Sequence, residues 1–321
     1  MRLVLGLLIT AVALAVAARR IFFLYRMIAA GQPSPGRLAG WPKRLVGQVV
    51  EVFGQARLLK WSVPGIAHFF VFWGFIILTF TIIEAFGALF DADFAIPVIG
   101  KSPVLGFLED FFGVAVLLGL IAFAIIRLRS KPAAVGRDSR FYGSHTTAAW
   151  VVLGMIFLVI FTLFGIRAAQ LNTGVSPWQE TPRAPFFSYL LSLPLEPLGE
   201  TVNERIEDVM VIGQIAVVMG FLVMVTYSKH LHIFVAPINV LTKRNPDGVA
   251  LGGLLPMMSN GKVLELEEAD PEVDTFGVAK VEDFTWTAML DMATCTECGR
   301  CQSQCPAWNT GKPLSPKLVI M

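Results

Sequence analysis

The chain has 321 residues, of which 55% are hydrophobic and 16% are charged, and its formal net charge is only +2. A mean hydropathy of +0.65 is too high for a soluble globular protein and is typical of a membrane protein. The small net charge argues against a nucleic-acid or other polyanionic partner. The sequence also has no phosphate-binding glycine loop, dinucleotide fingerprint or nucleophile elbow.

Five apolar runs are each long enough to cross the hydrocarbon core of a bilayer, which takes about 20 helical residues. Because lipid offers no partners for unpaired backbone groups, each run is predicted to be a helix. The runs are Leu3–Tyr25, Val63–Leu89, Phe107–Ile126, Thr147–Ile166 and Val209–Tyr227. A cleaved signal peptide is the alternative for the first run, although its apolar stretch resumes after Arg20.

Basic residues are concentrated in alternate loops, and this predicts the orientation of the spans. Lys and Arg predominate in residues 26–60 and 127–146 and recur from 229 onward, whereas residues 91–102 and 168–208 contain few of them. We therefore expect a multi-pass protein of the plasma membrane with its N-terminus outside and residues 229–321 in the cytoplasm. The amphipathic stretch 41–61 is expected to be a helix that lies on the cytoplasmic membrane face or packs on protein.

All four cysteines lie in one segment, Cys295-Thr-Glu-Cys298-Gly-Arg-Cys301-Gln-Ser-Gln-Cys305-Pro. This spacing is typical of a [4Fe–4S] cluster, since a short loop brings three thiolates to three corners of a cube. Zinc normally takes separated cysteine pairs or histidines, and disulfides need an oxidising compartment. Because the cysteine before proline serves the other cluster in two-cluster ferredoxins, either a second motif follows Met321 or Cys305 completes a single cluster.

The four histidines, His68, His145, His230 and His232, all fall near the predicted cytoplasmic ends of spans. Two facing imidazoles are the usual way in which a helical bundle holds haem b. We expect one haem b with His68 and His230 as its axial ligands. Positions 230 and 232 are about 200° apart on one helix, so a second haem held by His145 and His232 is the other interpretation. Interfacial hydrogen bonding is the alternative role, above all for His145.

Two polar residues lie within or beside the predicted spans. Glu84, near the outer end of the second span, is a candidate for proton handling, but an interfacial carboxylate facing water is the preferred interpretation. Gln214, in the fifth span, is expected to form a hydrogen bond between helices.

Several stretches resemble a known family. Five spans with histidines on the second and fifth are similar to the gamma subunit of membrane-bound nitrate reductase, a haem b protein that handles quinol. The added segment Trp286-Thr-Ala-Met-Leu-Asp-Met-Ala-Thr-Cys295 resembles the large membrane iron–sulfur reductases related to heterodisulfide reductase. The stretches Gly54-Gln-Ala-Arg-Leu-Leu-Lys-Trp and Tyr227-Ser-Lys-His-Leu-His-Ile-Phe are most similar to the actinobacterial membrane-bound electron transfer flavoprotein dehydrogenases.

The resemblance implies electron transfer from reduced electron transfer flavoprotein, charged in fatty-acid β-oxidation, through a [4Fe–4S] cluster and haem b to menaquinone. Its implied partners are the flavoprotein, the quinone and membrane lipid. The residues themselves leave two interpretations: an oxidoreductase, or a non-catalytic anchor and electron conduit of a heterodisulfide-reductase-like complex. A transporter or channel with a regulatory cluster is disfavoured, because five spans without inverted halves do not fit it.

We therefore expect an all-α membrane protein, a five-helix transmembrane bundle followed by a small cytoplasmic ferredoxin-like segment. The expected domains are a nitrate-reductase-gamma-like, cytochrome b-like domain over residues 1–240, a linker over 241–281, and the start of a [4Fe–4S] domain over 282–321. The linker prediction rests on the Gly-, Pro- and acid-rich residues 245–275. A short amphipathic helix over 282–291 should lead to the first cysteine, and a new helix should start at Ser315 and Pro316. We expect the ferredoxin part to continue beyond Met321.

Overall fold

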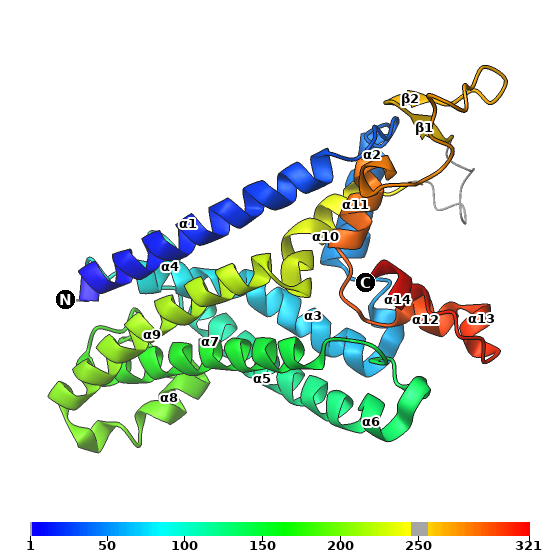
Figure 1. The fold of residues 1–321 in the computed structure, drawn as a ribbon. Coiled ribbons are helices and arrows are strands. Elements are labelled where there is room, and N and C mark those ends of the chain that lie inside the picture. Colours follow the sequence, from blue (N-terminus) through cyan, green and yellow to red (C-terminus); the bar gives the residue numbers. More distant parts are fainter. Residues whose placement is uncertain (1, 245–255) are drawn as a thin grey trace. The chain divides into compact units, whose positions relative to one another are not determined.

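The computed structural model describes residues 2–244 and 256–321 (Figure 1). In this part of the chain the only sheet is a two-stranded antiparallel hairpin of β1 (Met258–Ser259) and β2 (Lys262–Val263). The expected all-α membrane fold is confirmed. The α-helices are α1 (Arg2–Ala29), α2 (Trp41–Gly47), α3 (Ser62–Ile77), α4 (Thr79–Gly87), α5 (Pro103–Arg129), α6 (Pro132–Val135), α7 (Thr146–Thr173), α8 (Phe186–Ser192), α9 (Glu200–Thr226), α10 (His232–Leu241), α11 (Trp286–Ala293), α12 (Arg300–Gln304), α13 (Pro306–Asn309) and α14 (Pro316–Ile320).

Short helical turns complete the secondary structure. One is a π-helix, η1 (Gln48–Phe53). The others are 3₁₀ turns, namely η2 (Leu59–Trp61), η3 (Gly136–Asp138), η4 (Glu196–Leu198), η5 (Lys229–Leu231) and η6 (Val281–Asp283).

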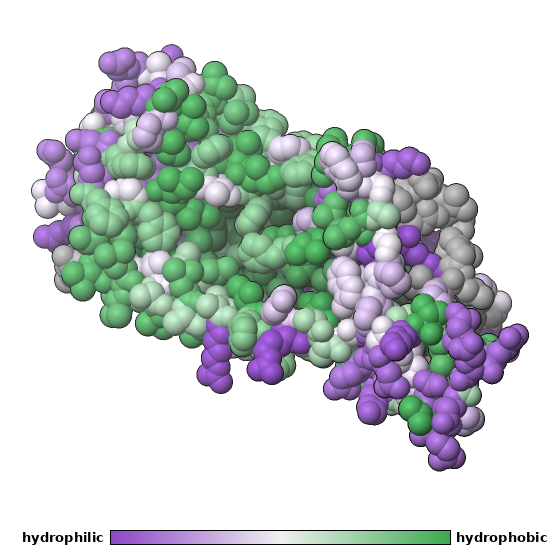
Figure 2. All heavy atoms as spheres, turned by 90° about the horizontal axis from the view of Figure 1, so that it is seen from above, coloured by the Kyte–Doolittle hydropathy of each residue, from purple (hydrophilic) through white to green (hydrophobic). Residues whose placement is uncertain are grey.

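Five helical stretches among the described residues are long and apolar enough to cross a membrane, as predicted. They are Arg2–Ala29, Leu59–Gly87, Pro103–Asp138, Thr146–Thr173 and Glu200–Thr226. The second is interrupted at Leu78, between α3 and α4. Hydrophobic side chains cover a broad, continuous area of the surface shown in Figure 2, as expected for helices that face lipid.

The chain divides into two compact units, and each is described by itself. The first unit comprises Met1–Ala17, Leu58–Lys131 and His145–Met224. The second comprises Ala18–Arg57, Pro132–Ser144 and Val225–Met321. The first unit thus holds most of the apolar helical length, and the second holds the cysteine segment.

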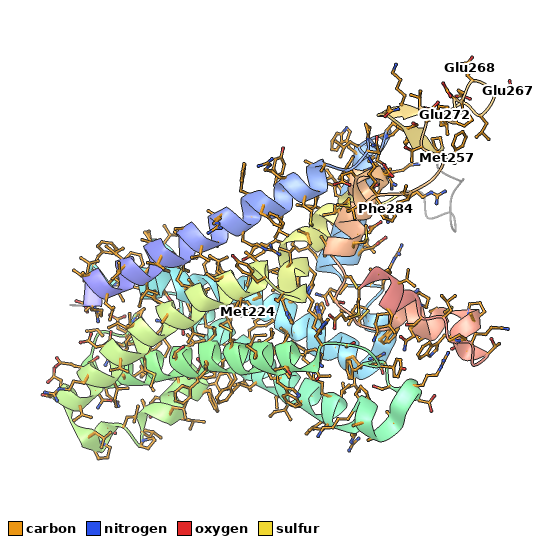
Figure 3. All side chains as sticks on the ribbon, in the orientation of Figure 1. Met224, Met257, Glu267, Glu268, Glu272 and Phe284 are labelled. Atoms are coloured by element: carbon orange, nitrogen blue, oxygen red, sulfur yellow. The ribbon has the colours of Figure 1, made fainter. Side chains whose placement is uncertain are left out.

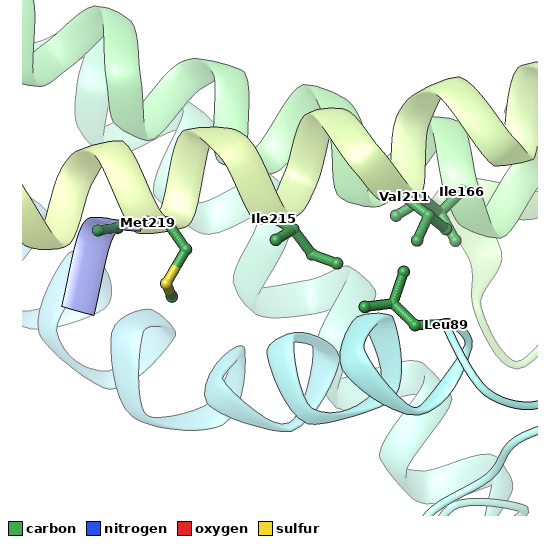
Figure 4. Close-up of a cluster of buried hydrophobic side chains, with 6 residues drawn as sticks. Leu89, Ile166, Val211, Ile215 and Met219 are labelled. Atoms are coloured by element: carbon green, nitrogen blue, oxygen red, sulfur yellow. The ribbon is translucent and has the colours of Figure 1, made fainter. Parts of the chain in front are cut away.

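In the first unit, α5 packs along α3 and also contacts α7 and α8 (Figure 1). Gly74 permits the close approach of α3 to α5, because a Cβ atom there would lie 2.4 Å from the Val116 side chain. Thr162 of α7 donates a hydrogen bond to Gln214 of α9, which confirms the predicted helix-to-helix hydrogen bond. Two apolar cores fill the unit: one of Ala13, Leu89, Ile166, Val211, Ile215 and Met219 (Figure 4), and one of Leu78, Val116, Leu120, Ile160, Leu163 and Phe164.

Trp178 anchors the connection between α7 and α8. Its side chain is buried, its Nε1 atom donates to the Ser102 carbonyl at 2.9 Å, and its ring centroid lies 4.7 Å from the Arg167 guanidinium carbon. A Cβ atom at Gly106 would lie 2.9 Å from the indole ring, so the glycine provides the space that the ring occupies. This connection therefore covers the end of the helices rather than extending into solvent.

In the second unit, α2 and η1 pack against α10, which also contacts α11. Arg44 is buried and donates from Nη1 to the carbonyls of Leu241 and Lys243, both at 2.8 Å, so it caps the C-terminal end of α10. The predicted single helix over residues 41–61 is therefore wrong. The structure has three shorter helical pieces, and α2 and η1 pack on protein.

The predicted linker is partly described. Residues 245–255 lie outside the described residues, and the hairpin of β1 and β2 follows them. Glu267, Glu268 and Glu272 are exposed in the segment after β2 (Figure 3). The acidic residues of this stretch therefore lie at the surface, where water solvates their charge.

Replacing Trp178 by Ala should destabilise the first unit by about 3–5 kcal/mol, because a large buried ring leaves a cavity and the Ser102 carbonyl loses its donor. Thermal unfolding in detergent, followed by circular dichroism, measures the loss. Trp41→Ala is the matched control, since Trp41 is 66% exposed. Equal effects of the two substitutions would contradict the role assigned to Trp178.

Candidate functional site

The cysteine segment begins directly after α11. Thr285 caps this helix by accepting a hydrogen bond from the Ala288 amide, so the short helix predicted over 282–291 is present with its start shifted to Trp286. The following loop turns sharply, with Glu297 (φ 56°) and Gly299 (φ 75°) in left-handed conformations. A Cβ atom on Gly299 would also lie 2.4 Å from the Arg140 carbonyl oxygen. Glycine is thus required there both by its backbone angle and by close packing.

The four thiols differ in exposure. Cys295 and Cys305 are half-buried, whereas Cys298 and Cys301 are exposed. Burial raises the pKa of the Cys295 thiol, a backbone hydrogen bond from Glu297 opposes this, and the neighbouring thiols of Cys298 and Cys301 raise it further. These three thiols therefore lie close enough to interact.

The chemistry of the four cysteines fits an iron–sulfur cluster, whose irons are normally held by thiolates. A cubane cluster binds one thiolate at each of its corner irons, so its four sulfur ligands stand apart instead of meeting at one point. Four cysteines on one turning loop, with no other thiol in the chain, match that requirement.

Two lysines hold the cysteine loop in place within the second unit. Lys229 forms an ion pair with Glu297 at 2.8 Å, and each side chain is only 10% exposed. Ser144 donates to the Glu297 carbonyl at 3.3 Å. Lys317, which is buried, donates to Ser144 Oγ at 2.9 Å and to the Arg140 carbonyl at 3.2 Å. The loop is therefore tied to two segments that are remote in sequence, one around Lys229 and one around Ser144, and Lys317 holds the second of these.

These ties also place positive charge beside the thiols. Burial lowers the pKa of the Lys317 ammonium, and the Glu297 carboxylate and the Cys301 thiol act in the opposite direction. A cationic group near a thiol favours its thiolate form, which is the form that binds metal. The sequence reasoning did not identify Lys229, Glu297 or Lys317, because nothing in their local pattern indicates the partners.

His230 and His232 do not lie on the end of the fifth span. The helix α9 ends at Thr226, Ser228 is extended (φ −133°, ψ 169°), and its hydroxyl accepts a hydrogen bond from the His230 amide, which caps η5. His230 therefore lies in a 3₁₀ turn, and His232 opens α10 with its ring centroid 6.0 Å from that of His230. The prediction that both histidines lie about 200° apart on one unbroken helix is wrong.

The His232 side chain has the hydrogen bond that orients many metal-binding imidazoles. Its Nδ1 atom lies 3.2 Å from the Lys229 carbonyl, so a proton on Nδ1 is donated there and the Nε2 atom carries the lone pair. Burial lowers the pKa of His232, with the Lys229 carbonyl acting in the opposite direction. In the corresponding contact of His230, Nδ1 lies 3.5 Å from the Ser228 hydroxyl. This geometry makes His232 a stronger candidate for a haem ligand than it was from the sequence, which favoured His230.

The other two histidines belong to the first unit. His68 lies in α3, half-buried between buried Ala67 and half-buried Phe69. His145 is exposed and is the residue that precedes α7. Since His230 belongs to the second unit, the pairing of His68 with His230 stays a prediction from the sequence.

Glu84 is not the water-facing carboxylate that we preferred from the sequence. It is buried in α4, and its Oε2 atom accepts a hydrogen bond from the Arg167 guanidinium. Glu109 of α5 accepts from the same guanidinium nitrogen at 2.8 Å. Arg167 lay one residue beyond the predicted end of the fourth span. The sequence did contain one sign of a buried ion pair, because Glu109 is an acidic residue inside a predicted apolar span.

Five potential membrane spans and a loop of four cysteines define a membrane-anchored protein with a candidate redox centre. The chain resembles three named proteins. It is 29% identical to an EtfAB:quinone oxidoreductase of Syntrophomonas wolfei and 31% identical to a probable iron–sulfur-binding oxidoreductase, FadF, of Bacillus subtilis, each over 87% of the chain. A probable membrane-anchored ferredoxin of Chromohalobacter salexigens is 36% identical over 29% of the chain and 12% of its own length.

The resemblance to membrane iron–sulfur oxidoreductases that the sequence predicted is therefore confirmed by these relatives. It spans only 37% of the Syntrophomonas protein and 36% of the Bacillus protein. No protein-family model matches the chain, and no solved structure matches it.

The ion pair between Lys229 and Glu297 should stabilise the cysteine loop by about 1 kcal/mol or more, since both side chains are largely withdrawn from water. Glu297→Gln in the cluster-free protein should therefore raise the rate at which an alkylating reagent modifies Cys295. Lys229→Gln should have the same effect, and the double variant should add little to either single variant. Glu272→Gln, at an exposed position, is the control. Additive effects of the two substitutions would show that the residues act separately.

Proposed function

We propose that the chain is the membrane and iron–sulfur part of an oxidoreductase that passes electrons from reduced electron transfer flavoprotein to menaquinone. The observation that carries this proposal is a four-cysteine loop in a chain with five potential spans, together with two relatives that align over 87% of it. One of these relatives is named an EtfAB:quinone oxidoreductase. The proposed setting is fatty-acid β-oxidation.

The proposed cluster ligands are Cys295, Cys298, Cys301 and Cys305. A [4Fe–4S] cluster, when bound, supplies reversible one-electron transfer. The chain's own residues hold the loop that would bind it: Lys229 pairs with Glu297, and Gly299 packs against the Arg140 backbone. Exposure of Cys298 and Cys301 leaves that side of the loop accessible to a partner protein that delivers electrons.

The proposed orientation places the cysteine segment in the cytoplasm. It rests on the Lys and Arg residues of segments 26–60 and 127–146, which the positive-inside rule assigns to the cytoplasmic face of the plasma membrane. A cytoplasmic flavoprotein would then meet the loop directly, and the apolar spans would give access to a lipid-soluble quinone.

A haem b held by histidines is a further part of the proposal. His68 and His230 are the preferred axial ligands from the sequence, and His145 and His232 are the other candidates. The hydrogen bond from His232 Nδ1 to the Lys229 carbonyl supports the inclusion of His232. No step of the electron path is assigned to a particular histidine.

A second candidate function is a non-catalytic membrane anchor and electron conduit of a heterodisulfide-reductase-like complex. The observation that favours it is the share of the relatives that the chain covers. The chain spans 36–37% of the two relatives that align over 87% of it, so the site at which electrons enter can belong to the remaining length of such proteins. The two functions differ in whether this chain accepts electrons from a donor by itself.

Purification of the chain from native membranes, without cross-linking, tests the donor. The proposal expects an electron transfer flavoprotein to co-purify, and its reduced form to transfer electrons to the isolated 321-residue chain in stopped-flow measurements. Co-purification without electron transfer to the isolated chain would favour the anchor function. Absence of a flavoprotein, with a different donor protein bound, would contradict the proposed donor.

Replacing Cys298 by Ser should abolish binding of the cluster, because one corner iron loses its thiolate. Iron and acid-labile sulfide per chain should fall to background, and the electron paramagnetic resonance signal of the dithionite-reduced protein should disappear. Thr296→Ser, in the same loop, is the matched control and should keep the full content. Unchanged iron and sulfide in Cys298→Ser would contradict the assignment.

The haem proposal predicts one haem b per chain in the pyridine haemochrome assay. His68→Ala should remove it, because a low-spin b haem needs both of its axial imidazoles, whereas His145→Ala should retain it. Two haems per chain would contradict the preference for a single site. Retention of haem in His68→Ala would contradict the choice of ligand.

A further inference from the structure

One guanidinium lies between two buried carboxylates inside the first unit. Arg167 of α7 donates from its Nη2 atom to Oε2 of Glu84 and to Oε2 of Glu109, the latter at 2.8 Å. The three residues are exposed by only 4%, 4% and 1%, respectively. Three polar atoms of this cluster, Glu84 Oε1, Glu109 Oε1 and Arg167 Nε, are buried and have no hydrogen-bond partner within the described residues.

The charges of this cluster do not balance. Two ionised carboxylates and one guanidinium leave one uncompensated negative charge in a unit made of apolar spans. Burying an uncompensated charge costs several kcal/mol even after relaxation. A proton bound to one of the carboxylates removes that charge, and it also gives a buried oxygen that has no partner the capacity to donate.

The surrounding charged groups do not supply the missing positive charge. Asp110, next to Glu109 on α5, accepts hydrogen bonds from the Phe187 amide, the Ser188 amide and the Ser188 hydroxyl at 2.6–2.7 Å, so it has donors of its own. Among the described residues, the other basic group near the cluster is Arg2 of α1, which pairs with Asp208 at 2.8 Å and approaches Glu207 at 4.0 Å.

Gln170 connects the cluster to Glu207. Its Oε1 atom accepts from Arg167 Nη1 at 3.2 Å, and its Nε2 atom faces Glu207 Oε1 at 3.4 Å. The charged groups next to the cluster are thus Asp110 of α5 and Glu207 of α9, and Arg2 of α1, which approaches Glu207, is itself paired with the exposed Asp208. The nearby electrostatics therefore favours protonation.

A small cavity with a mixed lining adjoins the cluster. It has a volume of about 10 Å³, its polar lining residues are Thr81, Glu84, Arg167, Gln170 and Gln214, and its apolar ones are Ala85, Ala88, Phe94, Leu163 and Ile166. This is about the space that one water molecule needs, and the lining offers the polar partners that a buried water requires. A water at this position would give the proton a route of exchange.

We propose that Glu84, Glu109 and Arg167 form a buried proton-binding site, in which one proton is shared between the two carboxylates and a single water occupies the adjoining cavity. Such a site takes up or releases its proton when the charge of its surroundings changes. The inference concerns the charge of these side chains alone and does not depend on the identity of the electron donor or acceptor.

The competing arrangement is a static ion cluster in which both carboxylates stay ionised. Infrared spectroscopy distinguishes the two, because a protonated carboxylic acid has a carbonyl stretch that a carboxylate lacks and that shifts when the proton is exchanged for deuterium. The sample is the full chain in lipid vesicles at neutral pH. The proposal predicts a deuterium-sensitive carboxylic acid band in the wild-type protein.

Substitutions assign the band. In Glu84→Gln and in Glu109→Gln the remaining carboxylate pairs one-to-one with Arg167, so each single variant should lose the band. Asp110→Asn, a buried carboxylate on the same helix with its own donors, is the matched control and should keep it. Absence of the band in the wild-type protein, or its persistence in both Gln variants, would overturn the proposal.

Thermal unfolding of the same variants provides a second measurement. Each single Gln variant should unfold near the wild-type temperature, because its Arg167 pair is electrically neutral. The double variant Glu84→Gln/Glu109→Gln should unfold at a much lower temperature, because it leaves the guanidinium buried without an anion. Equal losses in the single and double variants would show that charge balance does not govern the cluster, and would contradict the shared proton.

Discussion

Charge that is removed from water must be compensated by neighbouring groups, and this constraint governs both units of the protein. In the first unit Arg167 satisfies part of the charge of two buried carboxylates. In the second unit Lys229 and Lys317, both largely buried, find their partners on and around the cysteine loop. Each of these contacts joins segments that are remote in sequence. Charge compensation therefore also helps to hold those segments together within each unit.

The cysteine loop owes its shape to this arrangement. Glu297, between the first two cysteines, takes a left-handed conformation that few side chains adopt without compensation. Its ion pair with Lys229 and the hydrogen bond from Ser144 to its carbonyl supply that compensation. The four thiols are thus presented by a loop that is already folded, so less ordering is needed when a cluster binds. The same lysine precedes His230 and contributes the carbonyl that orients His232.

Much of the fold could be predicted from the sequence because its signals are local. The apolar runs predicted the five long helices, and the cysteine spacing predicted the loop. Ser315 and Pro316 predicted the start of α14, where the Ser315 hydroxyl accepts a hydrogen bond from the Leu318 amide. The break in the helix at Ser228, which separates His230 and His232 from α9, was missed because a run of Ser, Lys and His at the end of a span fits a continued helical turn as well as a break. The burial of Glu84 was also missed, since its partner Arg167 is distant in sequence and lay outside the predicted span.

The proposed electron path runs between a cluster on the cysteine loop and a quinone in the membrane. The most direct test uses the full 321-residue chain in lipid nanodiscs, with its cluster reconstituted, reduced by dithionite and freed of excess reductant. Addition of a menaquinone analogue should abolish the electron paramagnetic resonance signal of the reduced cluster within the mixing time of a rapid-freeze experiment. A signal that persists with the quinone analogue in excess would contradict the account.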